Sequence, residues 1–263
     1  MLILFPHMTI ALKSKEEIEI LREGGKRHAE ILRALRDMVK PGISTLTLEE
    51  EARRLIRESG DKPAHLGYIP YGAPRPFPAA LCISINDEIV HGIPNENPKI
   101  LKQGDIVSID LSLIHKGMFT DSAITVPVGA IDDESRKLLE VTQEALARGI
   151  AVAVPGGRIG DIGAAISAVV GPTGFSLAKD LVGHGVGYKI HEDPYVPNEG
   201  VSGDGERLVP GLVIAIEPMV NVGKPGIKTL ADGYTISTRD GSRSAHFEHT
   251  VAITEKGNII LTS

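Results

Sequence analysis

Two aspartates in the stretch from Gly104 to Val128 give the first indication of chemistry in this chain. Asp110 and Asp121 fall in two runs rich in β-branched residues, which a tight turn at residues 115–117 joins into a predicted hairpin. One turn register places Asp121 opposite Ser112 and the other places it opposite Asp110, so both put the two carboxylates on one face. Neighbouring carboxylates repel each other, and we therefore expect a cation between them, most simply a metal ion. The alternative is a solvated face with two unrelated acids.

Three further side chains that can bind metals fall at or near strand-like runs in the C-terminal third. His184 lies between glycines, Glu217 lies in the apolar run Leu212–Met219, and Glu248 lies in the run His246–Thr254. A buried carboxylate without a partner costs several kcal/mol. Glu217 must therefore be protonated, paired or bound to a cation.

Together these residues offer four carboxylates and one imidazole: Asp110, Asp121, His184, Glu217 and Glu248. This oxygen-rich set suits hard or borderline divalent cations, and four carboxylates can neutralise two of them. Between two ions about 3.5 to 4 Å apart, a bridging water is deprotonated near neutral pH while the ions polarise the carbonyl under attack. The sequence thus predicts a two-metal centre that hydrolyses amide bonds.

Caps and periodicity place the elements that must position these residues. The capping box Ser14–Glu17 predicts a long first helix, which Val39–Gly42 ends. Thr47 is predicted to cap a second helix, and residues 80–85 are typical of a strand. A third helix is predicted to run from Asp133 to about Val152.

The chain also carries signs of an internal repeat. Pro155-Gly156 follows the third helix as Pro41-Gly42 follows the first, and Asp161 is the predicted cap of the next helix, as Thr47 is in the first half. Both matches have the same offset of 114 residues. Such turns are common, so coincidence is one explanation; the other is a duplicated α/β half, with the site where the halves meet.

Length and composition restrict the class of protein. The 263 residues, 42% of them hydrophobic, can build a substantial globular core. A net charge of −6 with scattered basic residues argues against nucleic acid as a partner. The single cysteine, Cys82, excludes an intrachain disulfide and fits a reducing, cytoplasmic compartment. Because no apolar run approaches the roughly 18 residues that span a bilayer, we expect a soluble protein without a membrane partner.

Five separated motifs resemble, in order and spacing, those of the type I methionine aminopeptidases: SINDEIVHGIP, GDIVSIDLSLIHKGMFTDSA, GHGVGYKIHEDPYVPN, IAIEPM and HFEHTVAIT. The resemblance runs from about Ser14 to the C-terminus. It implies an α/β pita-bread fold, with two pseudosymmetric halves and a curved, mainly antiparallel sheet covered by helices. Residues 1–263 would form a single catalytic domain, with residues 1–13 as a ragged N-terminal segment.

The resemblance also implies a role for each matching residue. Two divalent ions (Co, Mn, Fe or Zn) would be held by Asp110, Asp121, His184, Glu217 and Glu248, with Asp121 and Glu248 as bridges. Glu217 would also accept the proton of the attacking water. His91 would contact the amide nitrogen next to the scissile bond, and His191 would donate to the carbonyl oxygen; without the motif match, both would pass for ordinary loop histidines.

Some positions depart from the family pattern. Ile190 stands where an aromatic residue is usual in the methionine pocket, and Tyr234 stands where tryptophan is usual. Phe77 and Cys82 align with pocket residues only loosely, because a proline-rich insert, 71–78, precedes them, and Cys82 is equally explained as a core residue. His246 replaces a frequent glutamine and is expected to adjust substrate or metal contacts.

The function that we expect is removal of the initiator methionine from nascent chains when the second residue is small. The partners would be N-termini of new polypeptides, with the enzyme acting as a monomer, in association with the ribosome or free of it. An Xaa-Pro peptidase of the same fold is the alternative within this class, although such enzymes usually carry an extra N-terminal domain. A binding protein that kept the fold and lost catalysis is the alternative outside it, and missing ligands would be its signature.

Overall fold

The computed structural model describes residues 10–70 and 72–263. The helices in this part of the chain are α1 (Lys15–Met38), α2 (Thr45–Ser59), α3 (Asp133–Val152) and α4 (Ile159–Val170), the last followed by a short 3₁₀ helix, Gly171–Thr173. The expectation of a ragged start falls mostly outside the described residues, as does Tyr71 of the insert. Over the described ranges, no helix combines the length and the apolar character needed to cross a membrane.

Within the described residues, the strands pair in antiparallel fashion and form four sheets. A central sheet holds β1 (Lys62–Pro63), β2 (Leu81–Ile85), β4 (Ile106–His115) and β5 (Met118–Pro127). A five-stranded sheet holds β7 (Val182–Gly185), β8 (Glu192–Pro197), β9 (Val213–Ile216), β14 (His249–Thr254) and β15 (Gly257–Ile260). Two small sheets hold β6 (Ser176–Leu177), β10 (Met219–Asn221) and β13 (Ser244–His246), and β3 (Glu88–Val90), β11 (Ile227–Thr229) and β12 (Ile236–Thr238).

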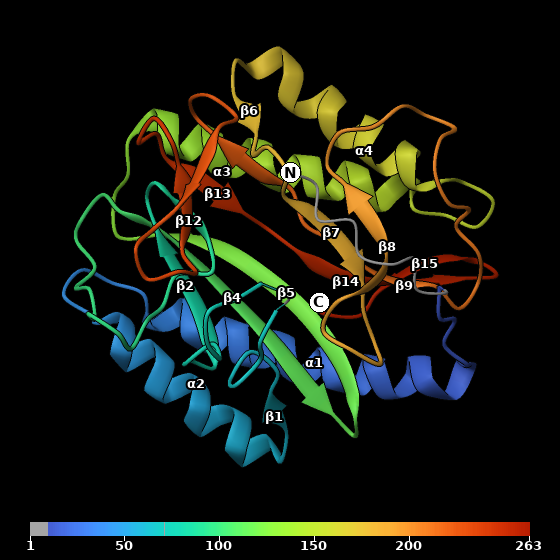
Figure 1. The fold of residues 1–263 in the computed structure, drawn as a ribbon, viewed down its shortest axis with the longest axis horizontal. Helices are drawn as coiled ribbons and strands as arrows, with labels where there is room; N and C mark the ends of the chain where they lie inside the picture. The colour runs from blue at the N-terminus through green and yellow to red at the C-terminus, as the bar shows by residue number, and fades with distance from the viewer. Residues whose placement is uncertain (1–9, 71) are drawn as a thin grey trace.

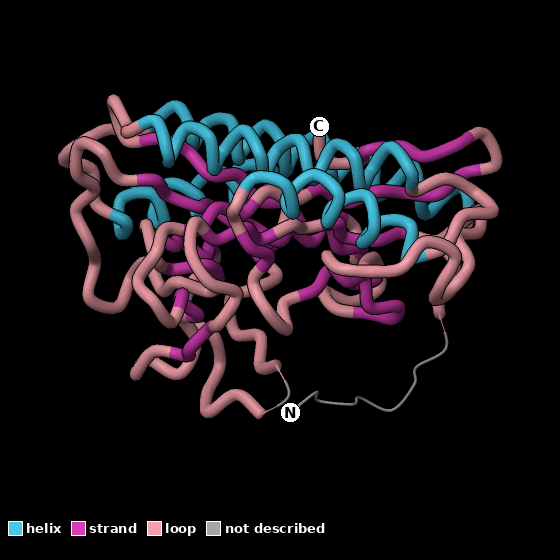
Figure 2. The backbone as a smooth tube through the Cα atoms, turned by 90° about the horizontal axis from the view of Figure 1, so that it is seen from above, coloured by secondary structure: helices cyan, strands magenta, loops and turns pink. Residues whose placement is uncertain are grey.

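The helices cover one side of the strand layer, and the long hairpin β4–β5 crosses the middle of the molecule (Figures 1 and 2). Apolar side chains of α1 and α2 pack on β2 and β4 in one core cluster. Those of α3 and α4 pack on β9 and β14 in another. The helices therefore leave the opposite face of the strand layer uncovered, and a functional site can form there among the loops. This arrangement confirms the predicted α/β fold with a mainly antiparallel sheet.

The offset of 114 residues extends well beyond the two turns in which the sequence first suggested it. Helices α1 and α3 end at Met38 and Val152, and α2 and α4 begin at Thr45 and Ile159. After the second helix of each half comes a glycine in the left-handed region, with φ of 79° at Gly60 and 86° at Gly174. The short strands β1 and β6 keep the same offset. Such agreement favours a duplicated half over coincidence.

The long first helix is confirmed, because Ser14 caps α1 and forms the capping box with Glu17. The predicted second cap is wrong by three residues. Ser44 caps α2, since its Oγ accepts a hydrogen bond from the backbone N–H of Leu46 at 3.2 Å, and Thr47 lies inside the first turn.

The error is repeated at Asp161, which lies in the first turn of α4. The helix begins at Ile159, and the carboxylate of Asp161 accepts a hydrogen bond from the backbone N–H of Arg158 at 2.8 Å. The two acceptors therefore stabilise their helix starts from different positions, and the repeat is unaffected because the helices themselves keep the offset.

The central hairpin has the first of the two registers that the sequence allowed. Its loop is Lys116-Gly117, both with positive φ, and Asp121 lies opposite Ser112. The apolar runs around Glu217 and Glu248 are not continuous strands, contrary to expectation. Each acid lies in a break: at Glu217 the chain passes from the five-stranded sheet to the small sheet that contains β10 and β13, and at Glu248 it passes back.

Candidate metal centre and active site

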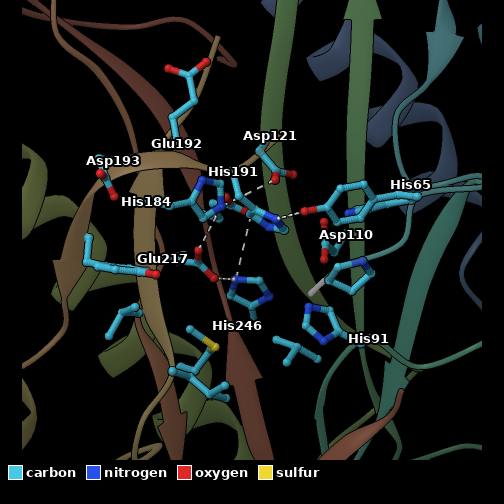
Figure 3. A pocket seen from close by; sticks show the side chains of 18 residues that line it. His65, His91, Asp110, Asp121, His184, His191, Glu192, Asp193, Glu217 and His246 are labelled. Carbon is cyan, nitrogen blue, oxygen red and sulfur yellow. Dashed lines mark hydrogen bonds and ion pairs between the residues drawn. The ribbon is translucent and has the colours of Figure 1, made fainter. Parts of the chain in front are cut away.

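A cavity of about 420 Å³ opens on the strand face turned away from the helices. It is lined by residues of both halves, and the seven side chains predicted to bind metal or to catalyse are all among them: His91, Asp110, Asp121, His184, His191, Glu217 and Glu248. Figure 3 shows the labelled members of this group turned toward one another. The structure thus brings together residues that the sequence separates by more than 150 positions.

Asp110 and Asp121 are presented by neighbouring strands of the central hairpin. Asp121 Oδ1 accepts a hydrogen bond from Ser112 Oγ at 2.7 Å. The hydroxyl of Thr250 on β14 bonds to the backbone of Asp121, accepting from its N–H at 2.8 Å and donating to its carbonyl at 2.7 Å. These bonds fix β5 against a strand of the other half and with it the position of the carboxylate.

His184 directs one ring nitrogen, Nε2, at the carboxylates. Its Nδ1 lies 2.9 Å from the carbonyl oxygen of Gly185, which can only accept, so Nδ1 carries the hydrogen. Nε2 lies 3.4 Å from Glu217 Oε1 and 3.8 Å from Asp121 Oδ2, and in the neutral ring it is the nitrogen that carries the lone pair. Such an orienting bond to a backbone carbonyl is typical of histidines that bind metal.

Burial makes the carboxyl groups of the cavity hard to ionise. It raises the pKa of Asp110 from 3.8 to about 7, and the charge of Glu217 adds to the effect. The pKa values of Asp121 and Glu248 are also well above their usual range, first because of burial and then because of the neighbouring acids. Without a compensating positive charge, the group would hold protons at neutral pH.

The donor set fits divalent cations. Asp110 Oδ1 and Glu248 Oε1 are buried and have no hydrogen-bond partner, although a buried polar atom normally has one. The described residues that line the cavity include neither lysine nor arginine. Buried carboxylate oxygens, an imidazole lone pair and an uncompensated negative charge are what a cation site provides.

A second imidazole, that of His246, faces the same carboxylates. Its Nε2 lies 3.4 Å from Glu217 Oε2 and 3.9 Å from Glu248 Oε2. The side chain is 2% exposed, and neither ring nitrogen has a hydrogen-bond partner. The sequence indicated a contact near the metals for this residue, and the structure places it between two of the acids.

His91 and His191 lie beside the acids. Burial is the main cause that lowers the pKa of both rings, so both are neutral at pH 7. His91 has a φ of 60°, in the left-handed region that residues other than glycine rarely adopt and that is frequent at functional sites. His191 Nδ1 lies 2.9 Å from the hydroxyl of Tyr68, and its ring stands edge-on to that of His184 with centroids 4.5 Å apart.

The predicted pocket residues Phe77, Cys82, Ile190 and Tyr234 are buried, but they are not among the described residues that line the cavity. Phe77 packs edge-on against Tyr234, with centroids 5.1 Å apart, and against His65 at 5.9 Å. Phe77, Cys82 and Tyr234 belong to one buried cluster and lie behind His65, whereas Ile190 is not part of that cluster. Sequence reasoning missed the lining residues His65 and Tyr68, because they lie in an irregular segment whose side-chain directions no periodicity predicts.

The chain belongs to metallopeptidase family M24, whose family model matches residues 19–255. It is 49% identical over 257 residues to a methionine aminopeptidase of Aquifex aeolicus, an alignment that covers 97% of this chain and 99% of the relative. A crystal structure of methionine aminopeptidase from Thermotoga maritima superimposes with a TM-score of 0.92 at 41% identity, covering 97% of this chain and 100% of the other.

The likeness to prolidases is more distant. Prolidase from Pyrococcus furiosus has a TM-score of 0.75 at 24% identity, covering 97% of this chain and 66% of that one. At this identity the comparison bears on the fold, which is the pita-bread fold that the sequence motifs implied.

Proposed function

We propose that this protein is a metal-dependent aminopeptidase that removes the initiator methionine from new polypeptides when the second residue is small. One observation carries the proposal: buried carboxylates and an imidazole converge in a cavity without a lining cation, in a chain that aligns over nearly its whole length with methionine aminopeptidases. The Xaa-Pro alternative has only the fold in its support. A non-catalytic protein of this fold would be recognised by the loss of ligand residues, and all five of the proposed ligands are present in this chain.

In this proposal Asp110, Asp121, His184, Glu217 and Glu248 would hold two divalent ions, with Asp121 and Glu248 serving both. The unpartnered oxygens of Asp110 and Glu248 and the lone pair of His184 support this assignment. When bound, such ions polarise a carbonyl and lower the pKa of water. Mn, Fe, Co and Zn all suit a site of this composition.

Glu217 is the proposed proton acceptor. Its side chain is 12% exposed, against 6% for Asp121 and 2% for Glu248, so it reaches furthest toward the open cavity where a substrate and its attacking water must lie. A carboxylate in this place can take a proton from the water and return it to the leaving amine.

His91 and His191 are assigned to the peptide. Both are neutral, so each can donate a ring N–H without the cost of a second buried charge. If the hydroxyl of Tyr68 donates to His191 Nδ1, the Nε2–H of that ring is free to donate to a developing oxyanion. His91 is assigned to the amide nitrogen next to the scissile bond.

The side chain of the substrate methionine is assigned to the apolar side of the cavity. Phe77, Cys82 and Tyr234 would support this pocket from behind His65, and Ile190 would support it from beside His191. We further propose that the chain acts as a monomeric, single catalytic domain in the cytoplasm, on chains emerging from the ribosome.

The test is release of free methionine from the peptides Met-Ala-Ser and Met-Lys-Ser. Chelator-stripped protein should release none, and each candidate ion in turn should restore release from Met-Ala-Ser but not from Met-Lys-Ser. The proposal fails if folded, metal-loaded protein cleaves neither peptide, and preferential cleavage of Xaa-Pro peptides would favour the alternative enzyme.

A further inference from the structure

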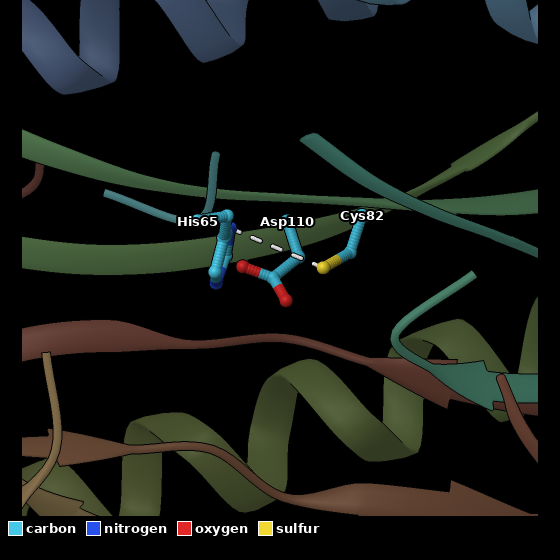
Figure 4. Close-up of side chains that lie close together, drawn as sticks. All are labelled: His65, Cys82 and Asp110. Carbon is cyan, nitrogen blue, oxygen red and sulfur yellow. Dashed lines mark hydrogen bonds between the residues drawn. The ribbon is translucent and has the colours of Figure 1, made fainter. Parts of the chain in front are cut away.

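A second group of possible metal ligands lies directly beside the carboxylate centre. It consists of His65, Cys82 and Asp110, which come from the segment after β1, from β2 and from β4. Cys82 and Asp110 are directly opposite each other in the antiparallel pair β2–β4, so their side chains lie next to each other on one face. Figure 4 shows the carboxyl group of Asp110 between the imidazole of His65 and the thiol of Cys82.

The distances suit a small ion. Cys82 Sγ lies 3.9 Å from His65 Nδ1, and the three donor atoms lie within 4.8 Å of one another. Sulfur and nitrogen ligands of a tetrahedral zinc ion are about 3.6 Å apart, given bonds of about 2.3 and 2.05 Å. A contraction of a few tenths of an ångström would therefore bring the two atoms to ligand distance.

One tautomer of His65 directs a lone pair at the thiol. Ser112 Oγ donates to Asp121 Oδ1 and lies 3.1 Å from His65 Nε2, so in the neutral ring Nε2 can donate to that hydroxyl. Nδ1, which faces the thiol at 3.9 Å, then carries the lone pair. Burial lowers the pKa of His65 to about 3, which keeps the ring neutral.

Asp110 supplies the third donor and the charge. Its Oδ1 is buried and has no hydrogen-bond partner. His65 and Asp110 line the cavity, so an ion can reach the group from there, while Cys82 closes it from behind. When the ion binds, the S–H bond of Cys82 breaks, the thiolate sulfur bonds to the ion, and the proton leaves to solvent through the cavity.

We propose that His65, Cys82 and Asp110 form a separate site for a thiophilic metal ion such as Zn²⁺ or Cd²⁺. Thiolate and imidazole favour such ions over Mn²⁺ or Mg²⁺, which prefer oxygen. Because Asp110 belongs to both sites, an ion held by Cys82 withdraws that carboxylate from the hydrolytic pair. An excess of a thiophilic ion therefore inhibits the enzyme. This inhibition rests on the proposed function, whereas binding of the ion to the site is independent of it.

The experiment is a titration of the chelator-stripped full chain with Cd²⁺, followed by the ultraviolet charge-transfer absorption of the thiolate–Cd²⁺ bond. Cys82 is the single cysteine, so the absorption reports this site alone. The band should saturate at one sulfur per chain, while equilibrium dialysis counts the ions bound. Cys82→Ser should lose the absorption band and bind one ion fewer. His65→Gln should bind Cd²⁺ at this site with an affinity lower by a factor of roughly ten or more.

Circular dichroism shows whether the variants are folded. If Cys82→Ser does not fold, His65→Gln provides the test, because it keeps the thiol and its absorption band. Inhibition by Cd²⁺ is measured relative to the Mn²⁺-supported rate of each variant. No band in the wild-type protein, or an unchanged ion count in folded Cys82→Ser, would overturn the inference. Failure of the proposed function would instead leave the band in place and show no release of methionine with any ion.

Discussion

Asp110 should destabilise the metal-free protein above neutral pH. Burial raises its pKa from 3.8 to about 7, with a contribution from the charge of Glu217. Because the folded-state pKa lies above the unfolded-state value, the folded protein binds this proton more tightly. Its contribution to stability is fully present below about pH 4 and is lost as the pH rises through 7. The raised pKa corresponds to about 4 kcal/mol of unfolding free energy.

The perturbation is Asp110→Asn, which keeps the shape of the side chain and cannot ionise. In chelator, urea unfolding at pH 8.5 should find the variant more stable than the wild-type protein by up to about 4 kcal/mol. At pH 4.5 the difference should fall to about 1 kcal/mol, because the wild-type carboxyl is then largely protonated in the folded state. Asp121 and Glu248 have raised pKa values of the same origin, and removal of a neighbouring charge eases their ionisation as well.

Divalent ions should reduce the difference between the two proteins. An ion at 100 times its dissociation constant stabilises the protein that binds it by about 2.7 kcal/mol, and Asp110→Asn, which lacks a ligand oxygen, should gain less. Equal unfolding free energies of the two proteins in chelator at pH 8.5 would refute the reasoning. So would a difference that does not change between pH 4.5 and 8.5.

Three further predictions concern single side chains. Glu217→Gln should lower kcat for Met-Ala-Ser by a factor of roughly 100 or more, and retained turnover at full metal occupancy would remove its catalytic assignment. In chelator, urea unfolding should find this variant no less stable than the wild-type protein, because the loss of its charge eases ionisation of the neighbouring acids. His246→Gln should weaken divalent-ion binding in calorimetry, since an imidazole that faces Glu217 and Glu248 is lost; unchanged binding constants would limit His246 to a packing role. Ser44→Ala should cost about 1 kcal/mol of stability and Thr47→Ala much less, and the opposite order in urea unfolding would restore the cap expected from sequence.

The sequence was most informative where a local rule has one outcome. The alternation of β4 and β5 and a two-residue loop leave two registers, and both put Asp110 and Asp121 on the same face, as the structure has them. Carboxylates inside apolar runs likewise indicated the site, because such groups need a partner. The residue types alone therefore indicated five side chains, Asp110, Asp121, His184, Glu217 and Glu248, that the structure brings together in one cavity.

The sequence was less informative where two residues satisfy the same rule or where distant contacts decide. Ser44 and Thr47 are both good caps, and the choice depends on where the chain arrives from the preceding turn. The breaks at Glu217 and Glu248 come from pairing with two different sheets, which an uninterrupted apolar run does not reveal. The positions of His65 and Tyr68 depend on a loop without periodicity.

The residues of the centre come from both halves of the fold, and this has a consequence for how the chain is held together. Asp121 lies on β5 of the first half, and Glu248, which lies 127 residues further along the sequence, follows β13 of the second. An ion held by both, as proposed, would act as a cross-link and close a loop of that length, which would remove entropy from any state in which the halves separate. In a chain whose single cysteine cannot form an intrachain disulfide, ions at the proposed centre would stabilise the fold as a covalent bridge does.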